Sequence, residues 1–140
     1  MAASILVDTG PILALIDRSD RWHHRCEAIL PRLPLPLLTS EAVLTEVFYM
    51  LRTDVRGIEV AWKFVQSGAL TLGPITEPDF PWLHSLMKQY ADLPMDFADA
   101  TLVYLAQRHA LDTVFTVDSD FLVYRIRGRR PFRVVPDLTR

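Results

Sequence analysis

The chain has 140 residues, of which 50% are hydrophobic and 23% are charged, and its formal net charge is −2. This length fits one domain with a sizeable core, so we expect residues 1–140 to form a single domain. The sequence has no apolar run near the ~20 residues that span a bilayer, no basic segment of the kind that begins a secretory signal, and one cysteine, Cys26, which excludes an internal disulfide framework. A cytoplasmic protein without a membrane partner is therefore expected.

The first third of the chain begins with a strand and continues in helices. Residues 4–8 form a short apolar run and are predicted to be a strand. A helix is predicted to begin near Pro11, where the missing N–H matters least. A second helix is predicted over 22–30, and the proline-rich stretch 31–36 is predicted to be an extended connector because proline cannot continue a helix.

The middle of the chain is predicted to be mostly helical. Ser40 is a suitable N-cap for a helix over about 41–52. A helix over about 57–67 precedes a short predicted strand at 70–72, and another helix is predicted over about 78–91.

The last third returns to strands. Asp96 is a suitable cap for a helix over about 97–108, and strands are predicted at 113–117 and 132–135. Strands that alternate with helices indicate an α/β fold with a central, mainly parallel sheet flanked by helices. The functional crevice of such a sheet lies at the carboxyl ends of its strands.

Four carboxylates lie where this pattern predicts the end or inner edge of a buried element. They are Asp8, Glu46, Asp99 and Asp118. Asp8 and Asp118 each follow an apolar strand, and Asp99 interrupts a helix that is apolar nearly all round. Like charges gathered in a poorly solvated place need a cation, and a divalent metal that prefers oxygen ligands suits them because the chain has only two lysines.

Each acid also has an ordinary structural explanation. Asp8 and Asp118 are suitable turn or helix-cap residues, and Asp99 suits the first turn of its helix. Glu46, taken alone, is better explained as a solvated helical glutamate. The joint placement of the four residues favours the metal hypothesis.

The positive charge of the chain gathers near its end. Six of the thirteen arginines fall in the last sixteen residues, and four of them, Arg125, Arg127, Arg129 and Arg130, are candidate contacts for an anionic polymer. A solvated terminus is the alternative explanation. No other group of residues gives a stronger signal: His23 and His24 are adjacent and would point to different faces of a helix, so packing or surface roles are favoured for them.

Four motifs give the chain a resemblance to a known family. They are Ile5-Leu6-Val7-Asp8-Thr9-Gly10-Pro11, Thr39-Ser40-Glu41-Ala42-Val43-Leu44-Thr45-Glu46-Val47, Leu93-Pro94-Met95-Asp96-Phe97-Ala98-Asp99-Ala100 and Phe115-Thr116-Val117-Asp118-Ser119-Asp120-Phe121. In order and spacing the sequence resembles the PIN-domain ribonucleases, and more narrowly the VapC-type toxins of toxin–antitoxin pairs. The resemblance spans nearly the whole chain.

The resemblance implies an endoribonuclease that depends on Mg²⁺, for which Mn²⁺ is expected to substitute. It places the catalytic acids at the four positions above, the metal ligands at Asp8 and Asp99, and supporting roles at Asp96, Asp120 and Thr116. It also implies an RNA substrate, whose phosphates Arg125, Arg127, Arg129 and Arg130 are expected to bind, a cognate antitoxin protein and a homodimer.

Two other functional classes stay open from the residues. One is an aspartate phospho-acceptor or phosphatase, which also places an acid at a strand end beside Mg²⁺, although residue 10 is Gly10 and neither lysine follows a recognisable strand. The other is a non-catalytic RNA-binding module in which the acids are structural.

Overall fold

The computed structural model describes residues 2–139. The strands are β1 (Ile5–Val7), β2 (Leu37–Thr39), β3 (Leu70–Leu72), β4 (Thr113–Phe115), β5 (Arg125–Ile126), β6 (Arg130–Pro131) and β7 (Arg133–Val135). The α-helices are α1 (Thr9–Ile16), α2 (His23–Ile29), α3 (Glu41–Met50), α4 (Val55–Gln66), α5 (Phe80–Gln89) and α6 (Phe97–His109). Short 3₁₀ helices occur at η1 (Leu30–Arg32), η2 (Glu77–Asp79) and η3 (Ser119–Leu122).

Five strands form one parallel sheet in the order β3-β2-β1-β4-β7. The chain moves outward from β1 to β2 and β3, and then returns to the other side of β1 to add β4 and β7. The strand order therefore reverses between β1 and β4, and the carboxyl ends of these two strands border a crevice of the kind in which α/β proteins bind ligands. The predicted α/β class and parallel sheet are confirmed.

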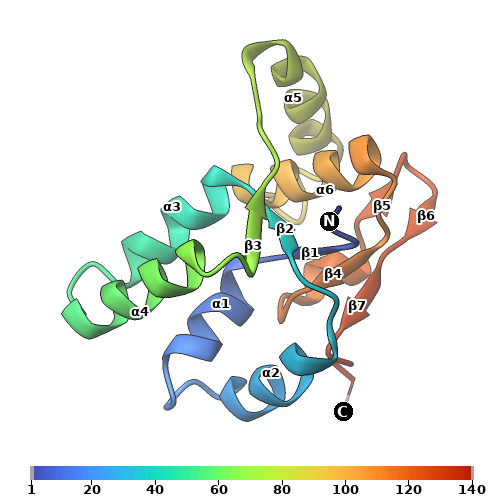
Figure 1. The fold of residues 1–140 in the computed structure, drawn as a ribbon. Helices are drawn as coiled ribbons and strands as arrows, with labels where there is room; N and C mark the ends of the chain where they lie inside the picture. The colour runs from blue at the N-terminus through green and yellow to red at the C-terminus, as the bar shows by residue number, and fades with distance from the viewer. Residues whose placement is uncertain (1, 140) are drawn as a thin grey trace.

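Helices pack on both faces of this sheet (Figure 1). In this view α5 and α6 lie above the central strands, and α1 and α2 lie below them. The inner strands are apolar on both sides, as expected for a covered parallel sheet, and Leu6, Val7, Val114 and Phe115 are fully buried. Among residues 2–139, no helix has the length and apolar character needed to cross a membrane.

Two details of the connections differ from the sequence expectation. The stretch 31–36 does not begin as an extended connector, because α2 continues into η1, where Pro31 occupies an early position that needs no N–H donor. The strand β2, which was not predicted, follows directly. Its three residues are fully buried but too few to show a period, and prolines precede them.

The other missed element is a small antiparallel hairpin of β5 and β6. It lies in the arginine-rich segment, where charged residues hide the alternation that marks a strand. Its turn contains Gly128 at φ 73° and Arg127 at φ 53°, so two consecutive residues adopt the left-handed conformation. This hairpin fixes the positions of the C-terminal arginines.

Candidate active site

Asp8 lies at the carboxyl end of β1, next to the point where the strand order reverses. Its side chain caps α1 by accepting a hydrogen bond from the backbone N–H of Thr9 at 2.7 Å. The other carboxylate oxygen accepts a hydrogen bond from Thr116 Oγ1 at 2.8 Å. Only 5% of the residue is exposed, and burial, which outweighs the two hydrogen bonds, raises the pKa of Asp8 to about 6.

Asp99 reaches the same place from the first turn of α6. Its backbone N–H is held by Asp96, the N-cap of this helix, and its Oδ2 accepts a hydrogen bond from the Tyr124 hydroxyl at 2.9 Å. The residue is 6% exposed. Burial, together with the neighbouring negative charges of Asp8, Asp96 and Asp118, raises the pKa of Asp99 to about 8.

Asp118 follows β4 and completes the group. Its backbone N–H donates to Thr116 Oγ1 at 3.0 Å, and its side chain caps η3 by accepting from the backbone N–H of Asp120 at 2.9 Å. Gly10 lets the start of α1 approach this loop, because a Cβ atom at that position would lie 2.5 Å from Cγ2 of Val117. This close approach brings the ends of β1 and β4 together.

The three aspartates form one cluster. One carboxylate oxygen from each of Asp8, Asp99 and Asp118 lies within 4.8 Å of the others. Within residues 2–139, the ion pairs of the structure involve other acids, so no lysine, arginine or histidine side chain neutralises these three. Buried carboxylates without a basic partner fit a hard divalent cation, which prefers oxygen ligands.

Glu46 and Asp96 lie beside this cluster, Glu46 linked to it through Thr9 and Asp96 through the backbone N–H of Asp99. The Thr9 hydroxyl donates to Glu46 Oε1 at 2.8 Å, while the backbone N–H of the same residue donates to Asp8. Burial raises the pKa of Glu46, and the nearby Asp96 adds to this effect. Asp120, on the other side, has a pKa raised by burial and by Asp118 and Asp96. All four principal acids, together with Thr116, Asp96 and Asp120, therefore gather at one end of the sheet.

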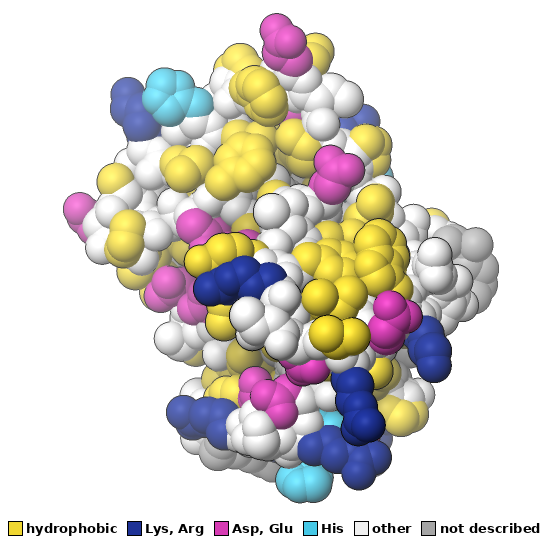
Figure 2. All heavy atoms as spheres, turned by 90° about the vertical axis from the view of Figure 1, so that its left-hand side faces the viewer, with side chains coloured by type: hydrophobic (Ala, Val, Ile, Leu, Met, Phe, Trp, Pro, Cys, Tyr) yellow, Lys and Arg dark blue, Asp and Glu magenta, His cyan; other side chains and the backbone are white. Residues whose placement is uncertain are grey.

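A groove of about 940 Å³ opens next to the cluster. It lies between α3, the start of α6 and the segment after β3, and Glu46 and Asp96 form part of its wall. Leu72, Phe80 and Phe97 contribute exposed apolar surface along it. Figure 2 views the molecule from the left-hand side of Figure 1 and shows hydrophobic side chains interspersed with acidic ones across this face. The groove thus joins apolar surface to the acidic site.

The match to a family model decides the classification. The model of the PIN domain matches residues 5–126, which include all the acids described above. The chain belongs to the PIN domain family. This PIN domain is 26% identical over 136 residues to Ribonuclease VapC26 of Mycobacterium tuberculosis (strain ATCC 25618 / H37Rv), and the match covers 94% of this chain and 100% of that protein. The resemblance to VapC-type proteins is thereby confirmed.

The fold of this PIN domain is also found in a solved structure. The crystal structure of Mycobacterium tuberculosis VapC20, described as a Sarcin-Ricin loop cleaving toxin, superposes with a TM-score of 0.79 at 22% identity. The superposition covers 91% of this chain and 100% of that one. It confirms the arrangement of the sheet and helices.

The C-terminal arginines of this PIN domain lie away from the acidic cluster. Arg127 donates to the backbone carbonyl of Gln107, near the C-terminal end of α6, and Arg130 forms an ion pair with Asp112 at 2.6 Å, just before β4. Asp99 and Gln107 are eight residues apart on α6, or about 12 Å along the helix axis. These two arginines are therefore held near the opposite end of α6 from the acids.

The other two candidate arginines differ in how firmly they are held. Arg125 Nη1 donates to the carbonyls of Leu122, Val123 and Tyr124, each at 3.0 Å, so this side chain stabilises the turn after η3. Arg129 is exposed at the tip of the hairpin. Of the four, Arg129 has the greatest freedom to follow a ligand.

Tyr124 is a site residue that the sequence did not indicate. It is fully buried, its ring packs edge-to-face against those of Tyr90 and Phe121, and its hydroxyl donates to Asp99. A tyrosine 25 residues from its partner gives no local signal. The only available indication was the apolar character of the segment after Asp120, which suggests that the aromatic residues there face the core.

For a divalent metal such as Mg²⁺ held by the aspartate cluster, we expect Tyr124→Phe to weaken the apparent affinity by about tenfold, because residues that orient metal ligands typically contribute 10–100-fold. The phenyl ring keeps the packing while removing the donor to Asp99. The measurement is the cleavage rate of an RNA as a function of Mg²⁺ concentration. Tyr49→Phe, which changes an exposed tyrosine on α3, is the matched control. An unchanged Mg²⁺ dependence in Tyr124→Phe would show that this hydroxyl does not position Asp99.

Proposed function

We propose that this PIN domain is a VapC-like toxin that hydrolyses RNA phosphodiesters with the help of Mg²⁺. The observation that supports this most is the convergence of Asp8, Asp99 and Asp118, within 4.8 Å, beside the crevice of the sheet. The name of the relative VapC26, a ribonuclease, supports the same activity. Mn²⁺ is expected to replace Mg²⁺ because it accepts the same oxygen ligands.

In this proposal Asp8 and Asp99 are the principal metal ligands, and Asp118 supports them from the loop after β4. Bound Mg²⁺ supplies Lewis-acid chemistry, which stabilises charge on the phosphodiester and makes water a better nucleophile. Thr116 holds the Asp8 carboxylate in place, and Tyr124 holds that of Asp99. The other oxygen of Asp8 accepts the backbone N–H of Thr9, and within residues 2–139 the other oxygen of Asp99 has no hydrogen-bond donor.

Glu46 is the proposed proton acceptor at the edge of the groove. Its raised pKa brings the carboxylate closer to the pH at which it takes and releases protons efficiently. The hydrogen bond from Thr9 fixes its orientation relative to Asp8. Asp96 and Asp120 are proposed to adjust the charge of the site. Asp96 also caps α6, and the backbone N–H of Asp120 donates to the side chain of Asp118.

The groove supports single-stranded RNA as the substrate. The exposed rings of Phe80 and Phe97 lie along it, and bases that are not stacked in a duplex bind to aromatic side chains. The acids themselves repel phosphates, so a metal ion and the distant arginines would both be needed to hold the strand. A flexible single strand of RNA would contact both the metal site and the arginines. The sequence that is cleaved is set by contacts beyond these residues.

A partner protein and a second copy of the chain are further parts of the proposal. The likeness to VapC-type toxins supports a small antitoxin as the partner and a homodimer as the assembled form. Large apolar side chains on α3 and α4 offer surface for such contacts, among them Met50, Val55 and Trp62. Size-exclusion chromatography with light scattering would test the homodimer directly.

The competing phospho-acceptor function finds no specific support. Lys63 lies on α4 and Lys88 on α5, and both are exposed, so neither of the two lysines lies beside Asp8.

The test of the proposed activity is cleavage of a labelled single-stranded RNA by the purified protein. We expect internal cleavage with Mg²⁺ or Mn²⁺ and none in EDTA, with activity restored when excess Mg²⁺ is added back. A DNA strand of the same sequence serves as the comparison substrate. Cleavage that persists in EDTA would overturn the metal requirement, and the absence of cleavage on a broad set of cellular RNAs would overturn the nuclease assignment.

The arginine proposal is tested separately. We expect the triple variant Arg127→Ala/Arg129→Ala/Arg130→Ala to bind RNA more weakly and to lower the slope of log affinity against log salt by about 2, since each phosphate contact on a single strand contributes about 0.7. Binding is measured with an uncleavable RNA over a range of salt concentrations. Arg56→Ala, an exposed arginine on α4, is the control. An unchanged slope in the triple variant would remove these arginines from the RNA interface.

A further inference from the structure

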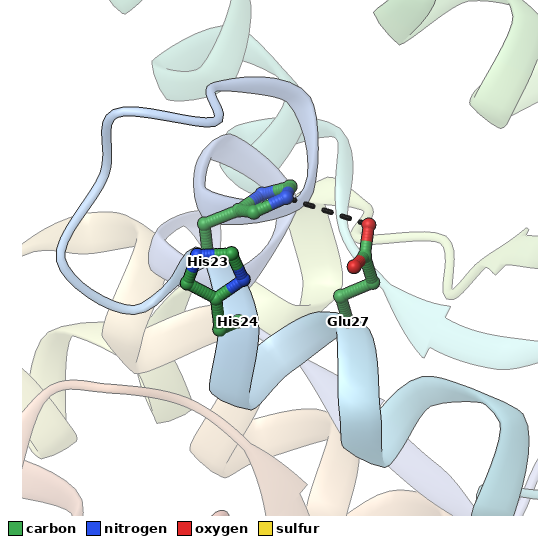
Figure 3. Close-up of side chains that lie close together, drawn as sticks. All are labelled: His23, His24 and Glu27. Carbon is green, nitrogen blue, oxygen red and sulfur yellow. Dashed lines mark ion pairs between the residues drawn. The ribbon is translucent and has the colours of Figure 1, made fainter.

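Two histidines and a glutamate form a second cluster at the start of α2 (Figure 3). His23 and His24 are the first residues of this helix, and Glu27 lies one turn after His23. A ligand atom from each of the three lies within 4.8 Å of the others. His23 contacts α1 at Ala14. Ala14 is six residues from Asp8, or about 9 Å along the axis of α1, so this cluster is separate from the acidic site.

The hydrogen bond of His23 determines which of its nitrogens is available. Nδ1 lies 2.7 Å from the carbonyl oxygen of Ala14, and because a carbonyl only accepts, Nδ1 carries the proton. In the neutral ring Nε2 is then an acceptor with a free lone pair. Histidines that bind metals have this arrangement, in which the second nitrogen donates to a backbone carbonyl and fixes the orientation of the ring.

Nε2 of His23 faces another acceptor. The Glu27 Oε2 atom lies 3.4 Å away, and Figure 3 shows the ring and the carboxylate pointing toward one another. A lone pair and a carboxylate at this distance repel unless a cation lies between them or the ring itself takes a second proton. Positive charge between these two atoms would therefore stabilise the pair, and a metal ion can supply it.

The distance of 3.4 Å between His23 Nε2 and Glu27 Oε2 matches the separation of two ligands on a tetrahedral metal. Bonds of about 2.0–2.1 Å place two ligands of a tetrahedral Zn²⁺ about 3.4 Å apart. His23 is 5% exposed and rigidly held, whereas His24 and Glu27 are exposed. The His24 ring lies 5.3 Å from the His23 ring, centroid to centroid, and can turn toward the ion at little energetic expense because it faces solvent. One preformed ligand and two adjustable ones leave the fourth position open to water.

We propose that His23, His24 and Glu27 bind a divalent cation of the borderline class, such as Zn²⁺, at this end of α1 and α2. Imidazole nitrogen is a favoured ligand for such ions, whereas Mg²⁺ prefers oxygen, so the two clusters select different metals. All three ligands lie on α2, and the bound ion fixes the imidazole ring of His23, whose Nδ1–H donates to Ala14 on α1. This site thus stabilises the packing of two helices, independently of the nuclease chemistry.

The experiment measures Zn²⁺ binding by competition with a chromophoric chelator, in the presence of excess Mg²⁺ to occupy the acidic site. We expect the wild-type chain to bind one Zn²⁺ and to gain thermal stability from it. His24→Ala and Glu27→Gln each remove one ligand without touching the bond between His23 and Ala14, so both variants are expected to fold. Each is expected to weaken Zn²⁺ binding at least about tenfold and to lose the thermal shift.

Two controls assign the binding to this cluster. His84→Ala removes an exposed histidine from α5 and is expected to leave the Zn²⁺ affinity unchanged. Asp99→Asn is expected to leave it unchanged as well, because the acidic site is elsewhere. The proposal is overturned if the wild-type chain binds no Zn²⁺, which would mean that a proton neutralises the pair, or if binding survives in His24→Ala and Glu27→Gln, or if it is lost in Asp99→Asn.

Discussion

Replacing Asp99 by Asn is expected to lower the rate of RNA cleavage at least about 100-fold while leaving the fold intact. The substitution removes one of two buried carboxylates that would hold the metal, and a metal contributes several kcal/mol to stabilising the transition state, where each 1.4 kcal/mol is tenfold in rate. Asn keeps an oxygen that accepts the hydrogen bond from Tyr124. It also removes the free-energy penalty of burying a charge, so the melting temperature of the metal-free protein is expected to stay the same or rise.

Asp92→Asn is the matched control for this variant. It makes the same chemical change at an exposed acid in the connection between α5 and α6. Single-turnover cleavage and thermal unfolding are measured for both variants. If Asp99→Asn cleaves RNA at the wild-type rate, the acidic cluster is not the site of the reaction; if it unfolds, the loss of activity says nothing about the metal, and Asp8→Asn then decides the question.

The stability of the metal-free protein is expected to fall as the pH rises from about 5 to 8. The pKa of Asp99 is raised from 3.8 to about 8 and that of Asp8 to about 6, so the folded chain holds protons that the unfolded chain has already released. Stability decreases with pH wherever the folded state binds more protons, by about 1.4 kcal/mol per pH unit for each such proton. The penalty is absent below about pH 4 and fully present above about pH 8.

Adding Mg²⁺ is expected to reduce this dependence, because the ion binds the ionised carboxylates and stabilises the folded state most at high pH. The measurement is the melting temperature from pH 5 to 8 in EDTA and in Mg²⁺. Asp99→Asn removes one titrating carboxyl, so it should flatten the curve in EDTA, and Asp92→Asn should not. A melting temperature in EDTA that rises through this range would contradict the burial of two uncompensated carboxylates.

The parts of the site that were predictable from the sequence are those fixed by local pattern. Asp8 and Asp118 each end an apolar run, and the carboxyl ends of neighbouring parallel strands necessarily meet. Asp99 stood out because it interrupts a helix that is apolar nearly all round. The structure brings these three together, although their roles as ligands remain predictions.

The parts that were not predictable depend on contacts between distant segments. Tyr124 reaches Asp99 because its ring packs against those of Tyr90 and Phe121, which come from separate segments. His23 and Glu27 have the i, i+4 spacing of neighbours on a helix, but the bond from His23 to Ala14, which sets the direction of the imidazole ring, has no local signal. The hairpin of β5 and β6 likewise determines that the arginines lie at the far end of α6 and not beside the acids.

The most direct test of the metal site is binding of Mn²⁺, followed by the loss of the free-ion signal in electron paramagnetic resonance. Wild-type protein and Asp92→Asn are expected to remove Mn²⁺ from solution with the same affinity, and Mg²⁺ is expected to compete for the same site. Asp99→Asn is expected to bind at least about tenfold more weakly. Equal Mn²⁺ binding by wild-type protein and Asp99→Asn, with both folded, would contradict the proposal that the buried aspartates hold the metal.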